Sequence, residues 1–253
     1  MEWREPFTLE DLQRYCEFYG IPFAHLPAIL ADQKVLPMLR GKGLEYYAFD
    51  RLQKLLPENR WSLQKLNVNA QPGASDVDLL VTHQETRVEI IVETKTPWRD
   101  SFRLSARSKP YPHFRVKCHK SRSNTQERER NDRYLVDDFD ILITNCENAL
   151  RVGGEGFGFT QDKEVIQFLK RYYSAKEEAE LIGYLATDLR CVLVNQIAKP
   201  DGTLPRQPEV RWERDPQWKS LSEIESLLSE VVKQKIIRQR RRIAKPTHKK
   251  LKA

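Results

Sequence analysis

The stretch that decides the fold is Ser75-Asp76-Val77-Asp78-Leu79-Leu80-Val81, followed after a polar segment by Val88-Glu89-Ile90-Ile91-Val92-Glu93-Thr94-Lys95. Two apolar runs flank residues 82–87, which are polar and turn-like, so the pattern predicts an antiparallel β-hairpin. Alternate residues of a strand share a face. Glu93 and Lys95 would therefore point to the same side, with Asp78 at the start of the partner strand. The opposite face would be filled by Val77, Leu79, Val88, Ile90 and Val92.

Two carboxylates and one ammonium would then meet at one end of the sheet. Neighbouring carboxylates repel each other and so favour a bound cation. Mg²⁺ suits such a site, because it binds through one or two carboxylates, several waters and a substrate phosphate. The bound metal polarises the phosphoryl oxygen and activates water, while a lysine can position that water or offset charge in the transition state. Asp78, Glu93 and Lys95 thus predict a site for phosphodiester hydrolysis.

The arrangement of Asp78 on one strand and Glu93-x-Lys95 on the next resembles the PD-(D/E)XK nuclease superfamily, the fold of most type II restriction endonucleases. Members often place a glutamate on a helix before the Asp strand, and the segment 41–49 with Glu45 fits that element. The resemblance covers roughly residues 41–145, under half the chain. The proline that often precedes the aspartate is absent here, as it is in many members. Asp76 competes with Asp78 for the ligand role, and Leu79-Leu80-Val81 directly after Asp78 favours Asp78, as in the family.

This resemblance implies a role for each residue. Asp78 and Glu93 would bind Mg²⁺ through their side chains, and the Thr94 carbonyl is a candidate third ligand. Lys95 would orient the water or stabilise the oxyanion. Glu45 would tune the site or help to hold a second ion. The products implied are 5′-phosphate and 3′-hydroxyl ends.

A simpler interpretation is a surface hairpin whose charges lie on its solvated face. Glu-x-Lys by itself is uninformative, because chance alone produces it in a chain of this composition. A more specific signal is the whole series in this order: a glutamate on a helix, an aspartate on a strand, a turn, and Glu-x-Lys on the next strand. The apolar run 88–92, interrupted only by Glu89, is also typical of a strand covered on both faces. Unpaired charge next to such a strand is costly, which favours a site over a solvated face.

Length and composition set the remaining bounds. The chain has 253 residues, 40% of them hydrophobic, which is enough for one large domain or two small ones with a substantial core. No apolar stretch reaches the length of a membrane span, and Met1–Glu5 lacks the features of a signal peptide. The four cysteines are far apart, and Cys118-His119 has no partner at metal-ligand spacing, so we expect reduced thiols in a cytoplasmic protein. The domain prediction is a single unit over 1–237, with an N-terminal helical region, and a basic tail over 238–253.

Positive charge is concentrated in two stretches. The formal net charge is +7, but residues 233–252 contain ten Lys or Arg and no acid, and the rest of the chain has a net charge of −3. Residues 103–122 contain seven more basic residues, again without an acid. Cations neutralise phosphates and release counterions, so this second stretch is the candidate DNA contact. Its members are Arg103, Arg107, Lys109, Arg115, Lys117, Lys120 and Arg122. A solvated loop, and a tail that only aids solubility, are the alternatives.

The predicted fold is α/β, with a mixed central β-sheet flanked by helices as in restriction endonucleases. The strands are expected at about 61–68, 76–81, 88–95, 139–144 and 189–197, and the main helices at about 8–20, 28–33, 37–55, 162–173, 175–184 and 221–237. The glycine-rich segment 153–158 lacks the Gly-Lys-Ser/Thr ending of a phosphate-binding loop, so it is interpreted as a flexible connector. No nucleotide cofactor is expected.

The function that follows is a Mg²⁺-dependent, sequence-specific double-strand DNA endonuclease of type II, acting as a homodimer with one active site for each strand. A structure-specific or repair nuclease of the same fold is the first alternative. A non-enzymatic DNA-binding protein is the second.

Overall fold

A six-stranded mixed β-sheet forms the centre of the protein. The computed structural model describes residues 8–66, 78–120, 132–152 and 158–243. The strand order is β1-β2-β3-β5-β6-β8. Only the central pair, β3 with β5, is parallel, and all the other neighbouring pairs are antiparallel. The strands are β1 (Trp61–Lys65), β2 (Leu79–His83), β3 (Glu89–Thr94), β5 (Ile141–Thr144), β6 (Arg190–Leu193) and β8 (Lys219–Ser220). The predicted mixed α/β architecture is confirmed at this level.

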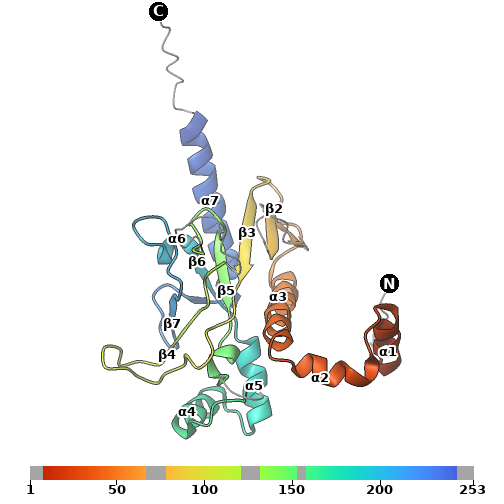
Figure 1. Ribbon diagram of the computed structural model, residues 1–253. Helices are drawn as coiled ribbons and strands as arrows, with labels where there is room; N and C mark the ends of the chain where they lie inside the picture. Colours follow the sequence, from red (N-terminus) through yellow and green to blue (C-terminus); the bar gives the residue numbers. More distant parts are fainter. Residues whose placement is uncertain (1–7, 67–77, 121–131, 153–157, 244–253) are drawn as a thin grey trace, which may run out of the picture.

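Helices surround this sheet, and a second, two-stranded sheet lies beside it (Figure 1). The small sheet pairs β4 (His113–Arg115) with β7 (Glu209–Arg211). The α-helices are α1 (Leu9–Phe18), α2 (Leu26–Ala31), α3 (Val35–Leu55), α4 (Lys163–Tyr173), α5 (Glu178–Thr187), α6 (Val194–Ile197) and α7 (Ile224–Ile243). Short 3₁₀ turns are η1 (Phe23–His25), η2 (Glu147–Leu150) and η3 (Leu221–Glu223).

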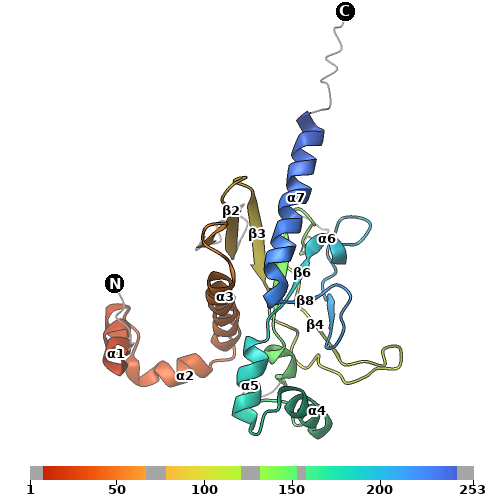
Figure 2. The ribbon, with the colours of Figure 1, turned by 180° about the vertical axis from the view of Figure 1, so that it is seen from behind.

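The sheet divides the core into two layers, because successive side chains of a strand point to opposite faces. On β5, Ile141 and Ile143 pack on one face with the buried residues of α3 and α7, and Leu142 packs on the other face with those of α4 and α5. Figure 2 shows α3 and α7 on the same side of the sheet. A strand with apolar residues on both faces is therefore covered from both sides, as the unbroken apolar pattern predicted.

The N-terminal helices form an extended arm. Figure 1 shows α1 and α2 leading away from the sheet, with α3 connecting them to it. Between residues 8 and 40, Cys16 is the one buried side chain. Most of the exposed large apolar residues of the described chain lie here or on α3: Leu9, Phe18, Tyr19, Ile29, Leu30, Met38, Leu39 and Tyr46. The arm thus adds little to the core.

Several predicted boundaries were wrong, including that of the helix expected at 175–184, which forms α5 at Glu178–Thr187. Thr82 and His83 belong to strand β2 rather than to the turn, because β1 pairs with them on the other side of β2. The predicted strand 189–197 ends at Leu193, and the chain then turns into α6. The last helix continues to Ile243, so the first part of the predicted tail is helical. In the part of the chain that the structure describes, no helix is both long enough and apolar enough to cross a membrane.

Candidate active site

The carboxylates of the predicted site lie at the end of the β2–β3 hairpin. The register pairs Leu79 with Val92, and its continuation by one residue places Asp78 opposite Glu93. Both are buried, with 8% of Asp78 and 1% of Glu93 exposed to solvent. The Thr94 backbone N–H donates a hydrogen bond to Asp78 Oδ2 at 2.7 Å, and the Thr94 hydroxyl donates another at 2.8 Å. Thr94 therefore fixes the Asp78 carboxylate. Asp76, the competing candidate, lies outside the described residues.

Lys95 is the cation of the site. Its ammonium forms an ion pair with Glu93 Oε1 and lies 5.4 Å from the centre of the Tyr134 ring. The Tyr134 hydroxyl donates to the same Glu93 oxygen at 3.3 Å. Burial acts to lower the pKa of Lys95, but the Glu93 carboxylate, with Tyr134 and Asp78 adding to it, raises this pKa above its ordinary value. Lys95 is therefore protonated at neutral pH, which suits a role in charge stabilisation rather than in removing a proton from water.

Glu45 approaches the site from the helix side. It lies on the inner face of α3, with 9% of its surface exposed. Its Oε2 forms ion pairs with Lys42 Nζ at 2.7 Å and with Lys65 Nζ at 2.9 Å. Burial raises the pKa of Asp78, and the negative charge of Glu45 raises it further. The helix glutamate is thus within electrostatic reach of the strand aspartate, which the sequence order alone could not establish.

The donor set fits a hard divalent cation. Burial and a like-charged neighbour make an ionised Asp78 costly, and a cation would relieve that cost. Carboxylate oxygens are the ligands that Mg²⁺ prefers, and Mg²⁺ completes its shell with waters. Among the described residues, no group of three or more His, Cys, Asp or Glu side chains is arranged to hold a metal. A metal here would therefore depend on two carboxylates, Asp78 and Glu93, on the Thr94 carbonyl and on water.

The predicted DNA-contacting cations are distributed over the loop and β4, and several have acidic partners. Ion pairs join Arg103 to Asp100 at 3.2 Å and Lys120 to Asp138 at 3.1 Å, and Lys109 is paired with Glu209. Arg115 donates to Gln207 Oε1 at 2.9 Å, Arg107 is exposed, and Lys117 Nζ lies 5.7 Å from the centre of the Trp98 ring. Arg122 lies outside the described residues. The stretch therefore offers less unpaired charge than its composition indicated.

Other residues in and near the site were not predicted from the sequence. Tyr134 contacts both Glu93 and Lys95 from a loop far along the chain, and no local pattern distinguishes this residue. Lys65 ends strand β1 and forms an ion pair with Glu45. Arg99, whose charge acts on Lys117, stands four residues before the basic stretch begins, so counting charge over a wider window could have included it.

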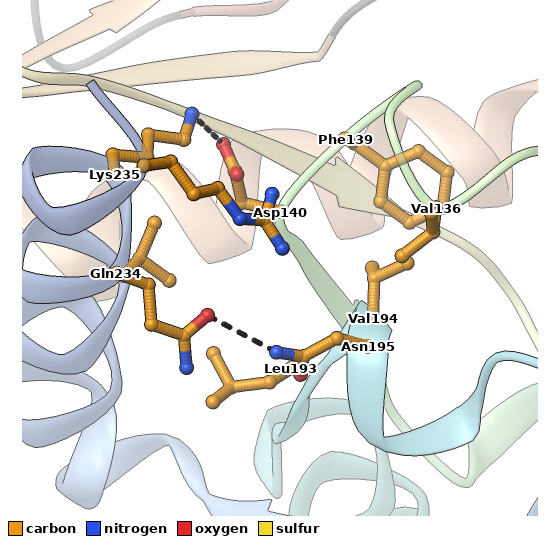
Figure 3. Close-up of a pocket in the computed structure, with 10 residues that line it drawn as sticks. Val136, Phe139, Asp140, Leu193, Val194, Asn195, Gln234 and Lys235 are labelled. Atoms are coloured by element: carbon orange, nitrogen blue, oxygen red, sulfur yellow. Dashed lines mark hydrogen bonds and ion pairs between the residues drawn. The ribbon is translucent and has the colours of Figure 1, made fainter. Parts of the chain in front are cut away.

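A separate hollow lies away from these residues. It has a volume of about 30 Å³ and lies between α7, the start of α6 and the segment before β5 (Figure 3). Lys235 Nζ binds Asp140 Oδ2 across it at 2.6 Å, and Asn195 Nδ2 donates to Gln234 Oε1 at 3.1 Å. Asp140 directly precedes β5 and lies beside Ile91, whereas Glu93 pairs with Leu142, two residues further along that strand. The size of the hollow admits a water or two, and its ion pair attaches α7 to the sheet.

Comparison with known proteins gave no significant match to a family model, a curated protein or a solved structure.

Proposed function

We propose that the protein is a Mg²⁺-dependent DNA endonuclease of the PD-(D/E)XK type, cutting double-stranded DNA at specific sequences to leave 5′-phosphate ends. The observation that supports this most is the buried pair Asp78 and Glu93 at one end of the hairpin, with a protonated Lys95 in electrostatic contact with both. A surface hairpin would leave such charges in solvent. Buried ionisable groups with shifted pKa values are typical of functional sites.

Each residue then has a defined task. Asp78, held by the two Thr94 hydrogen bonds, and Glu93 would bind the metal, which supplies Lewis acidity and an activated water. Lys95, protonated and held against Glu93, would stabilise the negative charge that develops on the scissile phosphate. Tyr134 would hold Glu93 in place. Glu45, near Asp78, would set the negative potential that attracts the metal.

The macromolecular partners in this proposal are double-stranded DNA and a second copy of the chain. A single active site cuts one strand, so a homodimer with two-fold symmetry is the simplest way to cut both. Sedimentation equilibrium with and without a DNA duplex tests this part separately. A cytoplasmic location completes the proposal, and the four free, buried cysteines are compatible with it.

The test is incubation of unmethylated phage DNA with the protein in Mg²⁺ and in EDTA, beside a Lys95→Gln variant. The matched control is Lys54→Gln, a change at an exposed lysine in the last turn of α3. We expect discrete bands that require Mg²⁺, persist in the control and are lost in Lys95→Gln. Circular dichroism establishes that both variants are folded.

Other outcomes select the alternatives. A smear that requires Mg²⁺ and Lys95 would indicate a nonspecific or structure-selective nuclease with the same site. Salt-sensitive DNA binding without cleavage of several DNAs would refute the enzymatic proposal and favour a DNA-binding protein. Cleavage that survives in Lys95→Gln would refute the assigned site.

A further inference from the structure

The segment 96–100, directly after the active-site strand, connects three parts of the chain. The Lys117 N–H donates to the Thr96 carbonyl at 3.0 Å, which attaches the segment to the strand region of β4. The Asn148 side-chain amide donates to the Pro97 carbonyl at 2.5 Å, which attaches it to η2. The oxygen of the same amide accepts a hydrogen bond from Arg40 of α3 at 3.3 Å. Residues distant in sequence are thus held around one short segment.

These contacts place three basic residues around the segment. Arg40 belongs to α3, Arg99 to the segment itself, and Lys117 follows β4 by two residues. Burial lowers the pKa of Lys117, and the positive charges of Arg99 and Lys95 lower it further. Burial likewise lowers the pKa of Arg40, where Glu147 acts in the opposite direction and Arg151 and Arg99 add to the lowering. The charge of Arg99 thus acts unfavourably on both of the other cations, and an anion bound among the three would relieve this repulsion.

A glycine lies beside these cations on the inner side of α3. Gly41 is one turn before Glu45, so both lie on the same face of the helix. Glycine inside a helix is unfavourable relative to alanine. A Cβ added at Gly41 would meet no atom within 4 Å, so internal packing in the described structure does not require the glycine. Glycine is also the residue that allows a ligand to approach the backbone closely.

We propose that Arg40, Arg99 and Lys117 bind adjacent phosphates of one DNA strand next to the carboxylate site, and that Gly41 lets this strand lie against the α3 backbone. The inference rests on the proposed function, because it takes DNA as the polyanion. It adds a backbone-binding surface formed by three separate segments. Only Lys117 belongs to the basic stretch that the sequence singles out. The electrostatic contact of Lys117 with Lys95 connects this surface to the active site.

The first experiment measures binding without cleavage. A fluorescently labelled duplex is titrated with protein in EDTA at several salt concentrations. For each of Arg40→Ala, Arg99→Ala and Lys117→Ala we expect an affinity loss of about tenfold and a slope of log K against log salt that is shallower by about 0.9. The matched control is Arg51→Ala, an exposed position further along α3, which should leave both quantities unchanged.

The second experiment uses Gly41→Ala, because its two expected effects have opposite signs. The variant should melt at the same temperature as the parent protein or higher, since alanine favours the helix. Its affinity for the duplex should fall by about tenfold. A loss of affinity accompanied by a lower melting temperature would overturn the role assigned to Gly41, since misfolding would then explain it.

These results separate the inference from the proposed function. If Mg²⁺-dependent cleavage is found but all three cation variants keep the parental salt slope, the binding surface is refuted and the nuclease stands. If no cleavage is found but the slopes of log K against log salt become shallower as described, the binding surface is supported and the enzymatic function is refuted. Identical slopes together with absent cleavage would refute both.

Discussion

Asp78→Asn should make the metal-free protein more stable while abolishing its activity. An asparagine has the shape of an aspartate, and its carbonyl oxygen can accept both hydrogen bonds from Thr94. The change therefore preserves these contacts and removes only a buried negative charge that lies near Glu45. Active sites often hold such unfavourable charge, and neutralising it stabilises the fold at the expense of function.

The structure limits how large this gain can be. Removing the desolvation cost and the repulsion from Glu45 favours the variant, but the attraction between Asp78 and Lys95 is lost as well. We therefore expect a net increase of about 1 kcal/mol in the free energy of unfolding, within the range usual for such changes. For a chain of this length that is a rise of about 2–4 °C in melting temperature. The assay is urea denaturation in EDTA, followed by circular dichroism.

The sign of the pH dependence follows from the raised pKa of Asp78. Between the ordinary aspartate pKa of 3.8 and the higher folded-state value, the native state binds more protons than the unfolded state at this residue. Its contribution to stability therefore falls as the pH rises through that window. Parent and variant should differ little at acid pH, and the advantage of Asp78→Asn should be complete once the pH exceeds the folded pKa.

Asp140→Asn provides a control of opposite sign. Asp140 also precedes a strand of the same sheet, but it forms an ion pair with Lys235 at 2.6 Å and accepts a hydrogen bond from the Ile91 N–H at 2.8 Å. Neutralising it removes a favourable charge pair, so this variant should lose about 1 kcal/mol. The comparison of the two aspartates tests whether a buried carboxylate that lacks an ion pair, as at Asp78, lowers the stability of the fold.

Magnesium should reverse the order of stability between parent and Asp78→Asn. A ligand at ten times its dissociation constant stabilises a protein by about 1.4 kcal/mol, so Mg²⁺ should raise the melting temperature of the parent but not of the variant. The reasoning is refuted if Asp78→Asn is destabilised in EDTA by as much as Asp140→Asn. A Mg²⁺ shift of equal size in the parent and in Asp78→Asn would remove Asp78 from the metal site.

Three further predictions concern the rest of the fold. Burial raises the pKa of both Cys118 and Cys191 to about 12. A thiol reagent at about pH 8 should therefore label neither residue until guanidinium is added, and rapid labelling of the native protein would contradict this. Leu52→Ala should cost about 3 kcal/mol in urea denaturation, because that side chain is fully buried between α3 and the sheet; a cost under about 1 kcal/mol would contradict this packing. Thr8→Ala removes the capping box that Thr8 forms with Asp11, so amide hydrogen exchange should accelerate in α1 while the global stability stays nearly constant. A drop of several degrees in melting temperature would show instead that the arm supports the core.

Local pattern predicted five of the six strands of the main sheet, but not the short edge strand β8 or the small β4–β7 sheet. The apolar runs around Leu79 and Ile90 became the β2–β3 hairpin, and the run at 139–144 became the buried strand β5. These predictions succeeded because a strand covered on both faces requires apolar residues at nearly every position. Errors fell at the ends of elements, as at Thr82 and Leu193, where pairing with a neighbouring strand or the start of a turn decides the boundary.

The candidate site could be predicted only in part. Asp78 and Glu93 were placed together because strand register is a short-range property, and a glutamate at the right point of α3 could be proposed from its order in the chain. Tyr134 was missed, because it reaches Glu93 from a loop whose path depends on distant contacts. The pairing of Lys109 and Lys120 with acids was likewise hidden, since Glu209 and Asp138 are far from them in sequence.

The sequence by itself determined the hairpin, the alternation of its faces and the identity of the charges at its end, because these depend on neighbours within about twenty residues. Only the tertiary structure decided how those charges are used. The packing of α3 against the sheet brings Glu45 near Asp78, and the loop containing Tyr134 holds Glu93 and Lys95. Burial and partner charges set the pKa of a group, and both arise only when segments remote in sequence pack together.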